Sequence, residues 1–116
     1  MKGFFVSQII PTLMVKVNQL ECNVIVDTGF TGEIMLPSGI IKRLKLSRIG
    51  KEDYLTADAH KYDADLYLGS IEWFGSPRAV IILECPANIM IFGMGLLRHC
   101  KMTLCPKQNC LELEKI

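Results

Sequence analysis

Short stretches in which polar and apolar residues alternate, separated by turn-forming residues, constrain the fold of this chain more than any other feature. Alternation runs through residues 13–17, 20–26, 62–68 and 111–114, and an apolar run fills residues 79–83. Successive side chains of a β-strand point to opposite faces, so this period of two predicts strands with one buried face. Many short strands with turns between them indicate an all-β fold that forms a closed or nearly closed β-barrel.

Turn and breaker residues suggest how the strands are connected. Asn18 and Gln19 separate the first two predicted strands, which favours a tight hairpin. A short strand over residues 33–36 is expected to stop at Pro37. Ser38 is then expected to cap a short helix over residues 39–46, whose apolar residues share one side.

Length and charge favour one soluble domain over residues 1–116. A chain of 116 residues, 50% of them hydrophobic, matches the size of a single domain and is too apolar to be disordered. The net charge of +1 gives no general attraction to nucleic acid or to an anionic membrane, and no apolar run is long enough to span a membrane. The basic cluster lacks interleaved aromatic residues, and we interpret it as the solvated side of the short helix. This cluster consists of Lys42, Arg43, Lys45, Arg48 and Lys51.

The cysteines favour a reducing compartment. There are five of them, an odd number, at positions 22, 85, 100, 105 and 110. Although His99 lies beside the evenly spaced last three, the chain lacks the close Cys-x-x-Cys pairs of structural zinc sites. We therefore expect mostly buried free thiols, no metal, no cofactor and a cytoplasmic, unexported protein.

One acidic residue stands where a buried strand ends. Val24, Ile25 and Val26 run into Asp27, and Gly29 permits the sharp chain reversal that ends the strand. The carboxylate of Asp27 is therefore expected at a junction between strand and loop, where it faces a cleft.

Three segments together resemble the retropepsins, the retroviral-type aspartic proteases. Asp27-Thr28-Gly29 is the signature of aspartic peptidases, and residues 89–97 resemble the hydrophobic-hydrophobic-Gly segment that follows the flap in retropepsins. Residues 56–60 resemble the tip of that flap. Phe30 after the signature is similar to the small prokaryotic subgroup. The resemblance implies a closed retropepsin-like acid-protease β-barrel with one or two short helices in a single lobe.

The resemblance also implies an aspartic-type endopeptidase that is active as a homodimer. Hydrolysis of a peptide bond by water needs a base and an acid, and two adjacent carboxylates that share one proton supply both. The chain carries one Asp-Thr-Gly, so the second Asp27 must come from another copy across a two-fold axis. Asp27 would be the catalytic residue, the Thr28 hydroxyl would brace the two loops, and Gly29 would let the substrate backbone approach.

Further residues are implied to bind a peptide or protein substrate. Ala57, Asp58 and Ala59 would cover an extended peptide from the flap, and Ile91 would line a hydrophobic subsite. The chain departs from the family at Ala59, near a position that often carries glycine. It also has Gly95 where the prokaryotic subgroup commonly has aspartate.

Two other functions remain open from the sequence. The first is a catalytically silent dimerisation or peptide-binding module, because a fold does not specify activity. The second is a small-ligand barrel with Trp73 and Phe74 in its pocket, although these residues fit better in a turn or hairpin that leads to residues 75–77. The intact Asp27-Thr28-Gly29 favours the enzyme, because an assembly role does not need that carboxylate.

Overall fold

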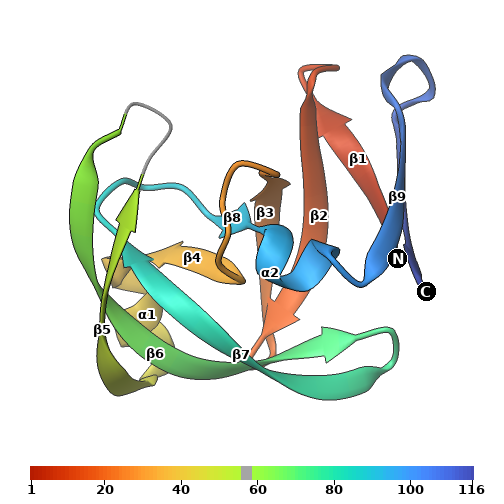
Figure 1. Ribbon diagram of the computed structural model, residues 1–116. Coiled ribbons are helices and arrows are strands. Elements are labelled where there is room, and N and C mark those ends of the chain that lie inside the picture. The colour runs from red at the N-terminus through yellow and green to blue at the C-terminus, as the bar shows by residue number, and fades with distance from the viewer. Residues whose placement is uncertain (56–58) are drawn as a thin grey trace.

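Strands dominate the computed structural model, which describes residues 1–55 and 59–116 (Figure 1). Two short α-helices, α1 (Ser38–Leu44) and α2 (Met94–Leu97), and one 3₁₀ turn, η1 (Pro106–Gln108), lie between the strands of this described part. The strands are β1 (Lys2–Val6), β2 (Ile10–Val17), β3 (Leu20–Val26), β4 (Ile34–Pro37), β5 (Ser47–Leu55), β6 (Lys61–Trp73), β7 (Ser76–Cys85), β8 (Ile91–Phe92), β9 (Cys100–Cys105) and β10 (Cys110–Lys115).

The strands pair in a closed circuit. Their order in the sheet is β5-β6-β7-β4-β8-β3-β2-β1-β10-β9, and a further pairing joins β2 to β6 through Val17 and Ile71. Each of the six strands β2, β3, β8, β4, β7 and β6 therefore has two neighbours within the circuit. The all-β fold predicted from the sequence is confirmed.

Asn18 reinforces the closing contact. Its backbone N–H donates to the carbonyl of Ser70 at 2.8 Å, and its side-chain Oδ1 accepts from the Ser70 N–H at 2.8 Å. Asn18 and Gln19 adopt φ values of 46° and 73°. Because left-handed backbone at both turn positions matches the twist of a hairpin, the predicted turn between β2 and β3 is confirmed.

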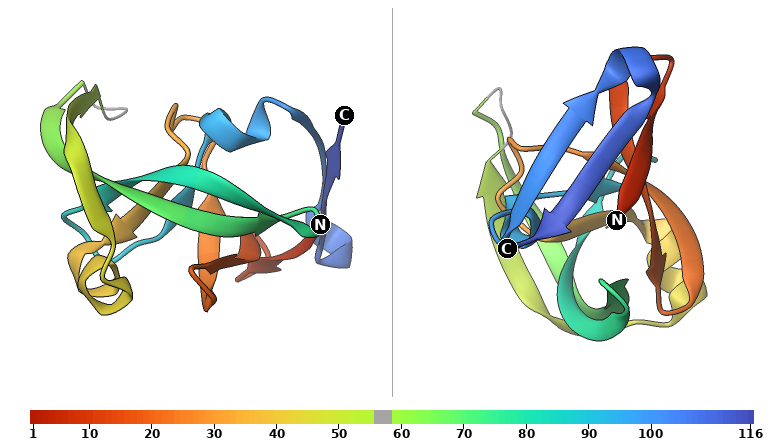
Figure 2. Two further views of the ribbon diagram at one scale, coloured as in Figure 1. Left: turned by 90° about the horizontal axis from the view of Figure 1, so that it is seen from below. Right: turned by 90° about the vertical axis from the view of Figure 1, so that its right-hand side faces the viewer.

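Two hairpins extend from opposite ends of the circuit. β5 and β6 form a long arm at one end, and β9, β10 and β1 lie side by side at the other (Figures 1 and 2). Both termini lie in the second group, where the N-terminal ammonium of Met1 donates to the carbonyl of Leu113 at 2.6 Å. β3, β8 and α2 lie between these two ends (Figure 1).

The core follows the predicted alternation. Leu13, Val15 and Val17 of β2 are buried, as are Cys22, Val24 and Val26 of β3. Cys22 therefore packs as a small apolar residue, as the sequence predicts. A second, smaller cluster contains Met35, Ala64, Leu83 and Cys85, with Phe30, Leu66 and Ile91 packed against it.

Some local predictions were wrong. The N-cap of α1 is Pro37, and no side chain caps this end, because the helix already includes Ser38. Arg48 and Lys51 belong to β5, so the basic cluster is not one face of a helix. Strands β1, β5, β8 and β9 were not predicted as strands. On β5 the side chains from Lys51 to Asp53 are exposed on both faces, which removes the alternation that marks a half-buried strand.

Candidate active site

Asp27 lies one residue beyond the end of β3, where its backbone is bonded to β8. Its backbone N–H donates to the carbonyl of Phe92 at 3.0 Å, and Ile25 N–H donates to Met90 at 2.8 Å. These bonds make β8 a parallel neighbour of β3, with Ile25 opposite Ile91. β8 in turn pairs with β4, which follows the Asp27 loop. The strands before and after the loop are thus held by the same short strand, which limits movement of Asp27.

The loop directs the Asp27 side chain toward its own backbone. Oδ1 accepts a hydrogen bond from Gly29 N–H at 2.8 Å, and Phe30 N–H donates to the Asp27 carbonyl at 3.2 Å. Oδ2 has no hydrogen-bond partner among residues 1–55 and 59–116. Asp27 is half-buried, whereas Thr28 and Gly29 are exposed. One carboxylate oxygen is therefore oriented by the protein and the other is available to water or a substrate.

Gly29 leaves the space that this arrangement needs. A Cβ at position 29 would lie 3.1 Å from Asp27 Oδ1, closer than most real Cβ contacts. A side chain there would also cover the exposed loop next to the carboxylate. Glycine at this position therefore keeps access to Asp27 open.

Residues 93–95, which belong to the second retropepsin-like segment, pack directly against the Asp27 loop. Gly93 N–H donates to Glu33 O at 2.9 Å, Met94 N–H to Phe30 O at 2.7 Å, and Gly95 N–H to Gly32 O at 2.9 Å. Three successive amides at the start of α2 thus satisfy three carbonyls of residues 30–33. This contact explains why the two motifs, distant in sequence, belong to one site.

Backbone contact this close excludes side chains at the late glycines. A Cβ on Gly93 would overlap Gly32 O and the Phe30 ring and would lie 2.6 Å from Phe30 O. A Cβ on Gly95 would lie 2.8 Å from Gly32 O. As noted from the sequence, position 95 carries glycine in place of the aspartate that is common in the prokaryotic subgroup. The backbone contact explains this difference, because it leaves no space for an aspartate side chain.

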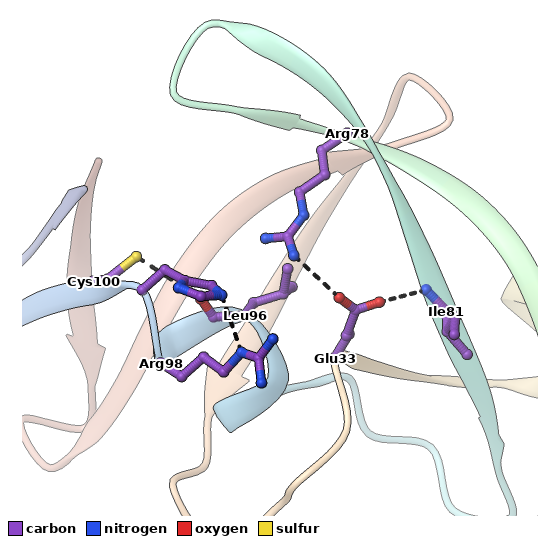
Figure 3. A network of polar contacts seen from close by, with 7 residues as sticks. Glu33, Arg78, Ile81, Leu96, Arg98 and Cys100 are labelled. Atoms are coloured by element: carbon purple, nitrogen blue, oxygen red, sulfur yellow. Dashed lines mark hydrogen bonds and ion pairs between the residues drawn. The ribbon is translucent and has the colours of Figure 1, made fainter. Parts of the chain in front are cut away.

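Glu33 connects the loop to β7 and was missed as a site residue. Its Oε1 accepts from the backbone N–H of Ile81 at 2.8 Å, and its Oε2 lies 3.4 Å from Arg78 Nη2 (Figure 3). Arg78 also lies over the ring of Trp73, 5.5 Å from its centroid. A charged residue that directly precedes the apolar strand over residues 34–36 was the available signal in the sequence.

Trp73 belongs to the core and does not line an open pocket. It is buried, with its ring stacked 5.8 Å from Phe92 and in edge contact with Phe74 at 4.9 Å. Arg78 lies over the same ring. Trp73 ends β6, and Phe74 and Gly75 form the turn to β7, as the sequence predicts. These contacts weaken the small-ligand interpretation of Trp73 and Phe74.

The remaining predicted substrate contacts lie in different parts of the structure. Ile91 is half-buried on β8 opposite Ile25 and, like Phe30, packs against the smaller core cluster. Ala59 is exposed just before β6 with φ of 65°, a left-handed backbone that favours glycine. Ala57 and Asp58 lie outside the described residues. No group of three or more potential metal ligands occurs in residues 1–55 and 59–116.

Comparison with known proteins identifies the fold. No protein-family model matches the sequence, and no curated protein matches it. A retropepsin-like aspartic protease from Rickettsia conorii matches in structure with a TM-score of 0.71 and 21% identity, over 99% of this chain and 89% of that chain. EIAV protease complexed with the inhibitor HBY-793 matches with a TM-score of 0.63 and 23% identity, over 77% and 86% of the two chains.

A third likeness is to the retroviral protease-like domain of Ddi1 from Leishmania major. It has a TM-score of 0.57 and 17% identity, over 92% of this chain and 90% of that chain. The chain therefore has the retropepsin-like aspartic protease fold, as the sequence motifs indicated. Within residues 1–55 and 59–116, no helix is both long and apolar enough to cross a membrane.

Proposed function

We propose that this protein is an aspartic endopeptidase that acts as a homodimer. The observation that carries the proposal is the half-buried Asp27 carboxylate, with Oδ1 oriented by Gly29 and Oδ2 open, on a loop held by β8 and α2. The retropepsin-like fold supports the same conclusion.

The chemistry requires two copies of Asp27. One carboxylate as an anion takes a proton from water, and the water oxygen attacks the peptide carbonyl. The other, protonated, donates to the oxygen on which negative charge develops. Two carboxylates about 3 Å apart cannot both ionise, so they share one proton, as the pair in aspartic proteases does. One chain supplies one such residue, so the pair forms across a two-fold axis.

The neighbouring residues take supporting roles in this proposal. Thr28 is exposed beside Asp27, and its hydroxyl would bridge to the partner loop. Gly29 would allow the substrate backbone to approach. Ala57, Asp58 and Ala59 of the flap would donate and accept main-chain hydrogen bonds along an extended peptide, and Ile91 would contribute to an apolar subsite. We place the protein in the cytoplasm, a reducing compartment, because the odd number of cysteines does not suggest a secreted disulfide framework.

The test compares the wild-type protein with Asp27→Asn on a diverse peptide pool, from acidic to neutral pH. Mass spectrometry reports the new termini at several protein concentrations. We expect cleavage by the wild type alone, with a rate that rises more steeply than linearly at low concentration because the active species is a dimer. The pH profile should be bell-shaped, because the rate needs one proton shared by the pair.

Two outcomes would contradict the proposal. Equal cleavage by both proteins would assign the activity to a contaminant or to another mechanism. Absence of cleavage by a sample that is dimeric in sedimentation would favour the alternative, a catalytically silent dimerisation or peptide-binding module. Thr28→Ser is a useful control, because it retains a hydroxyl beside Asp27 and should keep most of the activity.

A further inference from the structure

Two cysteines lie directly opposite each other across the last hairpin. Cys105 is the last residue of β9, Cys110 is the first residue of β10, and their Cα atoms are register partners. Opposed residues of an antiparallel pair project from the same face of the sheet. The two thiols are therefore neighbours on one surface, although four residues separate them in the chain.

The spacing of opposed strand residues suits a disulfide bond. Opposed Cα atoms in antiparallel strands lie about 5.5 Å apart in a hydrogen-bonded pair and about 4.5 Å apart in the other kind of pair. Cysteines joined by a disulfide have Cα atoms about 4.4–6.8 Å apart. Both kinds of pair fall within this range, so the hairpin can accept the bond without a change of register.

Contacts of the connecting turn hold both strands in this register. Asn109 N–H donates to Pro106 O at 3.0 Å, and Asn109 has the left-handed backbone, with φ of 50°. Its side-chain Oδ1 accepts from the Phe5 N–H at 2.8 Å. The residue just before Cys110 is thus attached both to its own turn and to β1.

The other three cysteines lack such a partner. Cys22 is buried opposite Val15, and Cys85 is buried opposite Pro37. Cys100 is half-buried like Cys105 and Cys110, but it lies opposite Lys115, and its Sγ contacts Leu96 O at 3.9 Å. All five cysteines lie within the described residues, so the opposed pair is unique among them.

We propose that Cys105 and Cys110 are a reversible dithiol–disulfide site that responds to low-molecular-weight disulfides such as oxidised glutathione. The thiolate of one cysteine attacks the small disulfide, forms a mixed disulfide and releases one small thiol. The second cysteine then attacks the protein sulfur of that mixed disulfide, closes the Cys105–Cys110 bond and releases the second small thiol. The protein dithiol is oxidised, the small disulfide is reduced to two thiols, and the two protons pass to those thiols.

Oxidation links the edge strand β9 covalently to its neighbour β10 at the turn. β9 is an edge strand, paired with β10 and with no other strand of the described part. The bond restricts separation of β9 from β10, so the oxidised protein should unfold at a higher temperature than the reduced one. This inference does not depend on peptidase activity.

The test exposes the native full-length protein to increasing ratios of oxidised to reduced glutathione, followed by acid quenching and alkylation of free thiols. Trypsin cuts after Lys101, Lys107 and Lys115, so Cys105 and Cys110 fall on separate peptides, 102–107 and 108–115. We expect these two peptides to appear linked, and the intact chain to lose about 2 Da, the two hydrogens released on disulfide formation. No other cysteine pair should be linked to a comparable extent.

Cys100→Ser is the matched control, because Cys100 is also half-buried on β9 but faces a lysine. It should keep the linked peptides and the rise in melting temperature, whereas Cys105→Ser and Cys110→Ser should each lose both. The same oxidation in concentrated urea measures linkage due to closeness in sequence alone. Equal linkage in urea and in buffer, no linkage in buffer, or linkage found only in covalent dimers would each overturn the proposal.

Discussion

At the scale of single residues, the candidate site depends on the absence of side chains. Gly32, Gly93 and Gly95 bring two backbone segments into direct contact, and Phe30 packs across Gly32 and Gly93. The three amides that support the Asp27 loop reach their carbonyls only because nothing separates the two segments. Small changes at these positions should therefore disturb both stability and the position of Asp27.

We predict that Gly93→Ala lowers the free energy of unfolding by about 1–3 kcal/mol, the usual cost of inserting a methyl group into a packed region. The added Cβ would collide mainly with backbone atoms, Gly32 O and Phe30 O, which cannot rotate away as a side-chain end can. Urea denaturation followed by tryptophan fluorescence measures the change, because Trp73 stacks on the adjacent Phe92.

Gly39→Ala is the control for this prediction. Gly39 lies in α1, and a Cβ there would have no neighbour within 4 Å. Alanine is favoured over glycine in helices, so stability should be unchanged or raised by up to about 1 kcal/mol. If Gly93→Ala were as well tolerated as Gly39→Ala, the close contact under the Asp27 loop would not be tight in solution.

At the scale of elements, the β5–β6 hairpin carries charges that both favour and oppose its pairing. Arg48 and Asp65 form an exposed ion pair at 3.1 Å, whereas Asp53 lies directly opposite Asp63. The pKa of Asp63 is raised above its ordinary value, because its protonated form donates a hydrogen bond to the Asp53 carboxylate and the charge of Asp53 disfavours its ionised form. Like charges directly opposed across a sheet are destabilising, so this hairpin should respond to pH.

The direction in which pH changes the stability of the hairpin follows from the linkage between proton binding and folding. Because the pKa of Asp63 is raised in the folded hairpin, the folded state binds its proton more tightly than the unfolded state. This contribution is fully present below the unfolded pKa and is lost as pH rises through the raised folded pKa. Amide exchange of β5 and β6, corrected for intrinsic rates, should therefore show more frequent opening toward neutral pH.

Asp53→Asn should remove most of the pH dependence of hairpin opening, because an amide can donate a hydrogen bond to an ionised Asp63 without repelling it. Glu52→Gln is the matched control, since it deletes the same charge from the same strand but at a position opposite Ala64. Similar protection from amide exchange in the two variants would show that net charge, and not the contact between Asp53 and Asp63, governs opening of the hairpin.

At the scale of the whole molecule, closure of the strand circuit depends on few contacts. β2 meets β6 at Val17 and Ile71, and the adjacent Asn18 adds two hydrogen bonds to Ser70. Asn18 also holds the left-handed backbone of the β2–β3 turn. One residue thus serves both the local turn and the long-range closure.

We predict that Asn18→Gly lowers the free energy of unfolding by about 0.5–1.5 kcal/mol, the net value of one hydrogen bond. Glycine tolerates the same backbone angles, so the loss should report the bond to Ser70 N–H and not strain in the turn. Gln19→Gly changes the other left-handed residue of the turn and should leave stability unchanged or slightly higher. Equal losses in the two urea titrations would attribute the effect to the turn.

Much of the fold could be predicted from local patterns. The predicted strand over residues 20–26 coincides with β3, and Asn18 and Gln19 form the expected hairpin turn. The short helix expected over residues 39–46 is found as α1 (Ser38–Leu44). Alternation and turn chemistry act between neighbouring residues, so one sequence contains the information needed. Strand β5 was missed for the same reason, because its exposed charges hide the alternation.

The sequence by itself determined that this chain is all-β and that Asp27-Thr28-Gly29 ends a buried strand. Only the tertiary structure decided which distant groups support that loop. Glu33 meets Arg78 across 45 positions, Asn18 meets Ser70 across 52, and β8 inserts between β3 and β4. These contacts depend on the order and register of strands, which long-range packing selects and which no local pattern specifies.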